Sequence, residues 1–375
     1  MVRFSRQLED LFERFILILG SVKMIYKLGE IFAGAGGFAW GAINADIGTG
    51  SKIIHAWAND IDKNACKSYR HNICKNDDSK SVICQDVRSL NTNNLDQIDA
   101  FAFGFPCNDF SLIGNKSGFN GKYGMLYRYG INIIDRFKPK FFVGENVSNL
   151  ASINKGIPFE TILSDMKSVG YNVFTHIFRF EFYGIPQTRH RLIFVGIRND
   201  YPFEYKPPST NSFKNIDTSV KSALNNPPIQ KDAFNHELPL HTDKFIERLK
   251  YIKPGKTAFD SNLPQHLQLK PKKNFYRCKY WRLDPDKPSR TILASWGNPF
   301  FHFEQNRTLT NRERARIQSF PDDFKFFGNK SDVQKQIGMA VPPRGAKIIF
   351  ESILKTFDGI YYESEPCKLS FSKGR

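Results

Sequence analysis

A cysteine with the surroundings of a nucleophile lies in the stretch GFPCNDFS, residues 104–111. Cys107 follows Pro106 at the end of the apolar run 100–105, which predicts a buried strand. Ligands of open α/β sheets bind beyond the carboxyl ends of the strands, so a thiol here would face a ligand site. The glycine-rich, polar loop that follows has the composition of a lid. The other interpretation of a single cysteine is buried filler, and the strand-end position argues against it.

A glycine-rich turn predicts a second part of the same site. The stretch EIFAGAGGFAWG, residues 30–41, contains the pattern G-x-G-x-x-A between a predicted strand and a predicted helix. Glycines in this pattern allow a ligand to approach bare backbone N–H groups at a helix N-terminus. Asp60 ends the next predicted strand, roughly 20 residues after the turn, where an acid can bind a ribose. The pattern leaves three alternatives open: NAD, another nucleoside cofactor, or a packed turn without a ligand.

Two further strand ends carry charged side chains. Glu145 directly follows four apolar residues in FFVGENV, and GIPQTRHRLIFVGIR brings Arg189 and Arg191 to the start of another apolar run. The two arginines alternate with His190, so we expect them to project to one face. Solvated charge flanking a strand is the alternative interpretation. With Cys107, these residues would place a thiol, a carboxyl group and two guanidinium groups beside a nucleoside pocket.

The elements needed to position these groups can be read from the alternation of apolar runs and helical patterns. Strands alternating with helices predict an α/β fold with a doubly wound, mostly parallel sheet. We expect strands at 24–32, 52–58, 81–84, 100–105, 141–144 and 191–197, and helices at 62–72, 124–137 and 157–168.

The composition changes near residue 199. Eleven of the 20 prolines lie between 202 and 288, and the basic stretch 270–290 interleaves lysines and arginines with Phe275, Tyr276, Tyr280 and Trp281. This predicts a second, smaller and irregular domain, with regular helices resuming at 310–318 and 343–356. The expected division is an N-terminal extension (1–23), a catalytic and cofactor-binding domain (24–198), the irregular domain (199–305), a return to the catalytic domain (306–356) and a C-terminal tail (357–375).

The charge of the chain indicates a polyanionic partner. The formal net charge is +17, from 54 Lys and Arg against 37 Asp and Glu. Such a balance favours nucleic acid, although a general preference for lysine would produce it too. The six cysteines form no CxxC pair and no zinc-finger spacing, which predicts reduced thiols in the cytoplasm and no metal site.

The apolar run FILIL (15–19) is too short to span a bilayer, so we expect neither a membrane anchor nor a signal peptide, and Met24 is an alternative start.

Taken together, the motifs resemble those of the DNA (cytosine-5)-methyltransferase family of bacterial restriction–modification systems. The resemblance runs from about residue 26 to 356 and follows the family's motif order. It is carried by FAGAGGF, NDID, QDV, GFPCNDFS, ENV, GIPQTRHR, NRTLTNRERARIQSFPDDF and QIGMAVPP. It implies a sheet of the S-adenosylmethionine-dependent methyltransferase type and a target-recognition domain over 199–305.

The resemblance also implies a mechanism. The Cys107 thiolate would attack C6 of a cytosine flipped out of the duplex, and C5 would then take the methyl group of S-adenosyl-L-methionine. Glu145 would hold N3 and the exocyclic amine, Arg191 would contact O2, and Arg189 would orient neighbouring groups and a phosphate. In the cofactor site, Asp60 would bind the ribose. The full set of implied cofactor contacts is Phe32, Gly34, Ala35, Gly36, Gly37, Asp60, Ile61, Asp86, Pro106, Met339 and Ala340.

The expected partner is double-stranded DNA, bound by a monomer, with a cognate restriction endonuclease acting on the same site. Asn108, Tyr123, Met339 and Glu30 stand where the family usually has glutamine, arginine, asparagine and aspartate. We expect activity because the four catalytic positions are kept. The alternatives are a methyltransferase acting on tRNA, a catalytically silent DNA-binding homologue, and an NAD oxidoreductase, which leaves the Pro–Cys pair unexplained.

Overall fold

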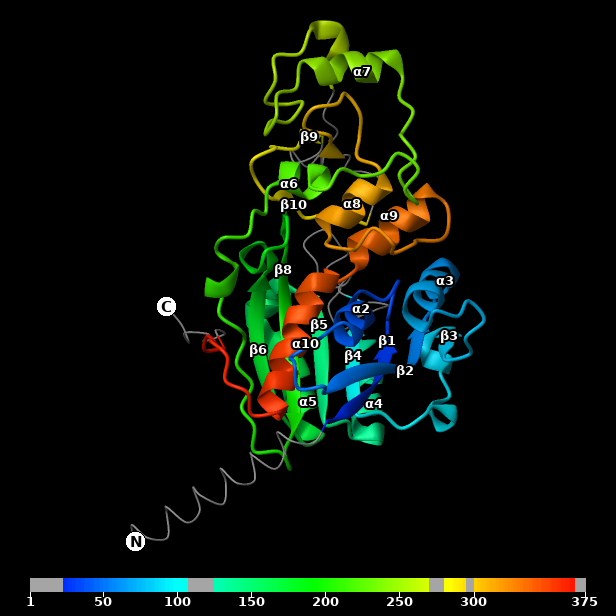
Figure 1. Cartoon of the computed structure of the whole chain (residues 1–375), viewed down its shortest axis with the longest axis vertical. Helices are drawn as coiled ribbons and strands as arrows, with labels where there is room; N and C mark the ends of the chain where they lie inside the picture. Colours follow the sequence, from blue (N-terminus) through cyan, green and yellow to red (C-terminus); the bar gives the residue numbers. More distant parts are fainter. Residues whose placement is uncertain (1–22, 107–124, 270–279, 295–299, 368–375) are drawn as a thin grey trace.

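The computed structural model of the chain describes residues 23–106, 125–269, 280–294 and 300–367. Figure 1 shows two lobes: a sheet with its helices, and a second lobe that carries α6, α7, β9, α8 and α9. The predicted nucleophile Cys107 and nearly all of the predicted N-terminal extension lie outside the described residues.

A seven-stranded sheet forms the larger lobe, with the order β3-β2-β1-β4-β5-β8-β6. Strands β1 to β5 pair in parallel, while β8 runs antiparallel to both neighbours. The predicted mostly parallel sheet is thus confirmed. The strands are β1 Ile25–Ile31, β2 Lys52–Asp60, β3 Val82–Cys84, β4 Ala100–Gly104, β5 Phe141–Val147, β6 Tyr171–Arg179 and β8 His190–Arg198.

Helices cover both faces of this sheet. On one face, α2 (Gly37–Ile43), α3 (Lys63–Tyr69) and α10 (Pro343–Phe357) pack on an apolar core; on the other lie α4 (Tyr127–Phe137) and α5 (Ile157–Ser168). Helix α10 returns from the far end of the sequence to pack against α2, as Figure 1 shows. The approach is close, because an ideal Cβ on Gly41 would lie 2.5 Å from the Cβ of Ala346.

The smaller lobe has little regular structure. Its elements are α6 Val220–Asn225, α7 Asp243–Lys250, β9 Trp281–Arg282, β11 Phe300–Phe301, α8 Asn311–Ile317 and α9 Lys330–Met339. A small apolar core of Leu249, Ile252, Ala258 and Phe301 is supported by the buried Arg282, whose guanidinium donates to the carbonyls of Leu249 (2.6 Å) and His302 (3.1 Å). Polar contacts to the backbone therefore hold together a lobe that has few ladders or long helices.

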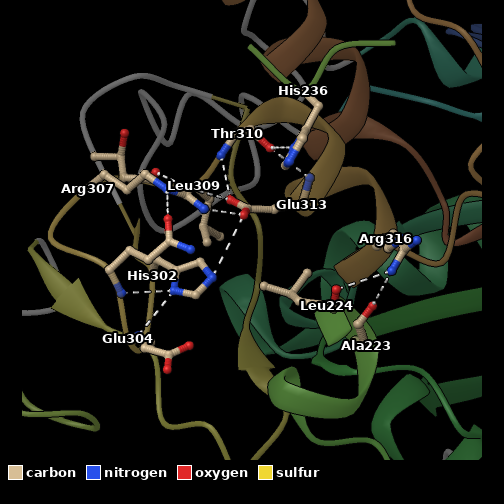
Figure 2. Close-up of polar contacts among 12 residues, drawn as sticks. Ala223, Leu224, His236, His302, Glu304, Arg307, Leu309, Thr310, Glu313 and Arg316 are labelled. Atoms are coloured by element: carbon tan, nitrogen blue, oxygen red, sulfur yellow. Dashed lines mark hydrogen bonds and ion pairs between the residues drawn. The ribbon is translucent and has the colours of Figure 1, made fainter. Parts of the chain in front are cut away.

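A buried carboxylate fixes the start of α8 (Figure 2). Thr310 and Glu313 form a capping box, in which the Glu313 carboxylate accepts from the Thr310 backbone N–H at 2.8 Å. Arg307 donates to both oxygens of the same carboxylate, at 2.6 and 2.8 Å. The two-pronged contact satisfies a charge that burial would otherwise penalise. The helix expected at 310–318 is confirmed.

The predicted boundary at residue 199 stays a prediction, because the following segment still packs on the larger lobe. The Tyr205 hydroxyl lies 3.1 Å from Ser352 Oγ on α10, and the Ser209 N–H donates to the Glu363 carbonyl at 2.8 Å. The first part of the predicted tail is therefore held in place. Within the described ranges, no helix is both long enough and apolar enough to cross a membrane.

Candidate functional site

The predicted chemical groups gather at one edge of the sheet. β1 ends at Ile31, directly before the glycine turn, β2 ends at Asp60, and β4 ends at Gly104, three residues before Cys107. β8 runs the opposite way, so its start lies at the same edge, where Arg191 pairs with Val147 of β5. The carboxyl ends of parallel strands form the ligand-binding edge of α/β proteins.

An acid and a guanidinium group meet beside the strand that leads to the cysteine. Arg191 Nε lies 2.7 Å from Glu145 Oε1, and the two side chains are 14% and 12% exposed. They are diagonal neighbours on β8 and β5, since Glu145 is paired with Ile193. An ideal Cβ on Gly104 would lie 3.2 Å from Glu145 Oε2, so the carboxylate lies against the end of β4. Thus Glu145 and Arg191 are adjacent to each other beside Gly104, the last residue of β4, three residues before Cys107 in the sequence.

Asn146 anchors the backbone directly after β4. Its side chain is buried, and its Nδ2 donates to the Phe105 carbonyl at 3.1 Å while its Oδ1 accepts from the Val147 N–H at 2.8 Å. These contacts hold the backbone directly before Pro106. The sequence pointed to Asn146 only as part of the ENV motif, and no role was predicted for it.

Arg189 has a different environment from Arg191. Its side chain is 1% exposed, and Nη2 donates to the carbonyls of Gly338 (3.1 Å) and Ala340 (2.9 Å). A third contact joins Nη1 to the Ile292 carbonyl at 3.4 Å. Because this guanidinium is enclosed, its geometry does not support the phosphate contact implied by the resemblance. Its contacts instead describe a positioning residue that fixes the segment after α9.

The segment at the end of α9 closes over the glycine turn. Ala340 also accepts from Gln318 Nε2 at 2.6 Å, a contact that sequence reasoning missed. An ideal Cβ on Gly37 would lie 2.5 Å from the Val341 carbonyl oxygen, so these segments are in close contact. Met339, a predicted cofactor contact, ends α9 with 61% of its surface exposed.

The glycine turn itself leaves room for a ligand. Gly34 has a φ of +55°, and an ideal Cβ built on it meets nothing within 4 Å. Its N–H donates to Asp60 Oδ2 at 2.7 Å, while Oδ1 accepts from Asp62 at 2.8 Å. Burial raises the pKa of Asp60 above its ordinary value, against the lowering effect of these two N–H groups. Ile61 is 67% exposed, which suits a side chain that covers a flat ligand.

The other predicted cofactor residues are placed as follows. Phe32 has a left-handed φ of +54°, and Gly36 packs on Tyr69 and Ile73. Asp86 forms an ion pair with Arg88 at 2.5 Å, so an adenine amine would share this carboxylate. Its adenine contact therefore stays a prediction. The remaining predicted contacts are the buried Ala35 and the half-buried Pro106.

A polar seam fixes α9 to α3. Lys335 Nζ lies 2.9 Å from Asp62 Oδ2, beside the predicted ribose acid. Asn64 donates to Asp332 at 2.9 Å, and Ser68 donates to Gln336 at 2.7 Å. These pairs join residues more than 260 positions apart, and no local pattern predicted them. They hold the closing segment over the cofactor edge.

A buried polar chain lies beneath the glycine turn. Tyr69 donates to Glu30 Oε2 at 2.5 Å, and His55 Nδ1 lies 3.1 Å from the same hydroxyl. Burial raises the pKa of Glu30 to about 8 and lowers that of His55 to about 4. Glu30 stands where the family usually has aspartate. It is thus a carboxyl group that the fold keeps protonated below about pH 8. Within the described residues, no group of three or more His, Cys, Asp or Glu could hold a metal ion.

Comparison with known proteins finds similarity to one family of enzymes. The family model of C-5 cytosine-specific DNA methylases matches residues 26–355. The Type II methyltransferase M.BbvI of Brevibacillus brevis is 45% identical over 362 residues, covering 93% of this chain and 96% of that protein. M.NgoFVII of Neisseria gonorrhoeae is 35% identical, covering 89% and 88%. A solved structure from an E. coli prophage, named as a DNA modification methyltransferase, has a TM-score of 0.69 at 22% identity, covers 88% of this chain and 99% of its own, and shows the shared fold.

Proposed function

The chain belongs to the C-5 cytosine-specific DNA methylase family, and from this premise we propose that it methylates one cytosine in a specific duplex sequence through a transient Cys107–C6 bond. It is a DNA (cytosine-5)-methyltransferase. The observation that carries the mechanism is the Glu145–Arg191 pair, 2.7 Å apart beside Gly104, three residues before the cysteine. An acid and a cation there can bind the polar edge of a pyrimidine.

The methyl donor that fits this edge is S-adenosyl-L-methionine. Open space over Gly34, an acid at Asp60 and the exposed Ile61 suit a small amino-acid part, a ribose and a flat base, respectively. When bound, this cofactor supplies an electrophilic methyl group on a sulfonium. Asp60 would bind the ribose hydroxyls, and Ile61 would cover the adenine. Ala340, held by Arg189, would close the site beside Gly37.

The residues divide the chemistry of the base between them. The Cys107 thiolate forms a bond to C6 and pushes the ring electrons onto C5, the atom that becomes methylated. Glu145 holds N3 and the exocyclic amine, which favours an N3-protonated, electron-poor ring, and Arg191 holds O2. A water molecule then takes the C5 proton, the C–H electron pair restores the C5–C6 double bond, the Sγ–C6 bond breaks, and the thiolate leaves.

Arg189 and Asn146 act on the reaction indirectly. Asn146 fixes the Phe105 carbonyl ahead of Pro106, and Arg189 fixes the carbonyls at the end of α9. Both are positioning residues, because both side chains are buried and both donate to backbone carbonyls. Precise placement of this kind is how protein scaffolds hold reacting atoms together.

The substrate would lie between the two lobes as duplex DNA. A net charge of +17 suits a phosphate backbone, and residues 199–305 would be mostly the target-recognition domain. Residues 24–198 and 306–356 would be catalytic, although α8 and α9 of the second range lie in the smaller lobe. The relatives named Type II methyltransferases support a restriction–modification setting. A cognate endonuclease and a cytoplasmic location are further parts of this proposal. A monomer is sufficient, since the acid, the cation and the glycine turn all come from one chain.

A methyl-transfer assay tests this function. Purified protein would be incubated with S-adenosylmethionine carrying a tritiated methyl group and either unmethylated bacterial genomic DNA or bulk tRNA. We expect label in DNA alone, recovered as 5-methylcytosine after digestion. Cys107→Ser should abolish labelling, whereas the matched variant Cys367→Ser should not. Labelling of tRNA in place of DNA, or full activity of Cys107→Ser, would overturn the proposal.

A further inference from the structure

We propose that Arg290 binds a phosphate of the DNA strand that carries the flipped cytosine, and so positions the substrate; the inference rests on the proposed function. Arg290 belongs to β10 (Ser289–Arg290), which pairs in parallel with β7 (Gln187–Thr188). This two-stranded ladder connects the smaller lobe to the segment that leads into β8. Arg290 thus stands where the second lobe meets the catalytic edge.

The alternation along this ladder directs Arg290 outward. Ser289 is paired with Gln187, and both are buried, whereas Arg290 is paired with Thr188 and both are exposed. Successive side chains of a strand point to opposite sides. The Arg290 side chain is therefore on the solvent side of the ladder, while the buried pair faces the interior.

An aromatic ring holds the guanidinium in place. Arg290 Cζ lies 3.8 Å from the ring centroid of the half-buried Trp281. A guanidinium resting on an indole keeps its N–H edges free, and those edges match the geometry of a phosphate. Among the residues that the structure describes, no carboxylate forms an ion pair with Arg290, so its charge is available to a ligand. Stacking also reduces the freedom that binding would remove.

Arg282 shows that these features are specific to Arg290. It lies in the same basic stretch but is buried, and its guanidinium is occupied by backbone carbonyls of the smaller lobe. Arg282 therefore supports the fold and cannot meet DNA. The positive charge of a stretch does not decide which of its arginines can contact a ligand; exposure and free N–H groups do.

Position favours a phosphate over a base edge. Thr188, the partner of Arg290, is three residues before Arg191, a spacing of about 10 Å in an extended chain. A flipped nucleotide remains joined to the duplex through its flanking phosphates, so a phosphate must lie at the mouth of the base pocket. The flipped base has left the stack at this point. The nearest polar groups of the DNA are then backbone oxygens.

The test is steady-state methyl transfer to unmethylated bacterial genomic DNA, which contains every short target sequence, at several salt concentrations. For Arg290→Ala we expect the KM for DNA to rise roughly ten-fold, with kcat changed less than about two-fold. The slope of log(kcat/KM) against log[salt] should lose about 0.9 units, the share of one phosphate. Arg290→Lys, which keeps the charge, should retain the slope and lose part of the affinity.

Arg136 provides the matched control. It is an exposed arginine beside an aromatic ring, with Cζ 5.6 Å from the Phe137 ring centroid, but it lies at the end of α4 that precedes β5, away from the strand ends of the site. Arg136→Ala should leave KM and the salt slope unchanged. An unchanged KM for DNA in Arg290→Ala would overturn this inference and leave the proposed function standing.

Bisulfite sequencing of the methylated DNA separates a phosphate contact from base reading. We expect wild type and Arg290→Ala to methylate the same sequence, because a phosphate contact carries no sequence information. A relaxed target sequence in the variant would overturn the phosphate assignment. Absence of methylation by the wild-type chain would refute the proposed function and this inference with it.

Discussion

Replacing Arg189 with methionine tests whether this buried arginine positions the cofactor edge. Methionine fills part of the same space but donates no hydrogen bonds. The carbonyls of Gly338 and Ala340 would lose their guanidinium donor, while Ala340 keeps its contact with Gln318 at 2.6 Å. The segment after α9 would then be less firmly held beside the glycine turn.

The size of the effect follows from these contacts. Two bonds, at 2.9 and 3.1 Å, are in the ordinary range, and the third, at 3.4 Å, is long enough to count little. Bonds to a charged group contribute about 1.5–3 kcal/mol each, and removing the buried charge recovers part of its desolvation cost. We expect the free energy of unfolding to fall by about 3 kcal/mol.

Arg312 offers a close control. It too is fully buried and donates to three backbone carbonyls, those of Phe234 (3.0 Å), Pro321 (3.0 Å) and Phe324 (2.6 Å). Because all three of its bonds are of ordinary length, Arg312→Met should lose at least as much stability as Arg189→Met in urea unfolding. Kinetics measured where both variants remain folded would then separate stability from positioning.

Arg189→Met should raise the KM for S-adenosylmethionine about ten-fold relative to Arg312→Met, which corresponds to the loss of roughly one charged hydrogen bond. Its kcat at saturating cofactor and DNA should fall less than about three-fold relative to the same control. Equal KM values in the two variants would refute the positioning role. Loss of kcat with an unchanged KM would instead show that Arg189 contacts the reacting base.

Two further predictions concern Glu30, which is buried beneath the glycine turn, and the glycines of the turn itself. Because the pKa of Glu30 is raised to about 8 in the fold, from 4.5 when unfolded, the folded chain binds the extra proton in this window. Urea unfolding should therefore show stability falling as pH rises from about 5 to 8, by at most about 1.4 kcal/mol per pH unit, relative to Glu30→Gln; parallel profiles would contradict the raised pKa. Gly34→Ala should cost about 1 kcal/mol for its left-handed φ and raise the KM for S-adenosylmethionine, because its methyl group enters open space. Gly37→Ala should lower the melting temperature more than Gly34→Ala does, because its Cβ would meet the Val341 carbonyl at 2.5 Å. A larger decrease in Gly34→Ala would contradict the assignment of Gly34 to open space and of Gly37 to a packed contact.

The sheet was largely predictable because its central strands are continuous apolar runs bounded by turn residues. The six expected strands are all present, and so are the helices expected at 157–168 and 310–318. β6, an edge strand, was missed because Asn172, Thr175 and His176 interrupt its apolar residues, so that YNVFTHIFR contains no continuous apolar run. Its content of β-branched and aromatic residues was the signal that would have revealed it.

The site was predictable only as far as strand ends could show it. Glu145 follows one apolar run and Arg191 begins another. The sheet brings the two side chains together although they are 46 residues apart in the sequence. The shared face of Arg189 and Arg191 was inferred from their alternation with His190 along the chain. That local pattern could not show that Arg189 is enclosed by the carbonyls of residues 292, 338 and 340. Contacts such as Asp62 with Lys335 depend on the return of α9 from far along the chain. Spacing alone carries no information about such pairs.

The central claim is that the sulfur of Cys107 bonds to C6 of the target base. DNA amplified with 5-fluoro-2′-deoxycytidine triphosphate carries a fluorine at C5 in every target, which blocks the loss of the C5 substituent and leaves the Sγ–C6 bond intact. After incubation with S-adenosylmethionine, protease digestion and mass spectrometry should find the nucleotide on the peptide that contains Cys107, and none in Cys107→Ser. An adduct on another cysteine, or none from protein that methylates ordinary DNA, would contradict the account.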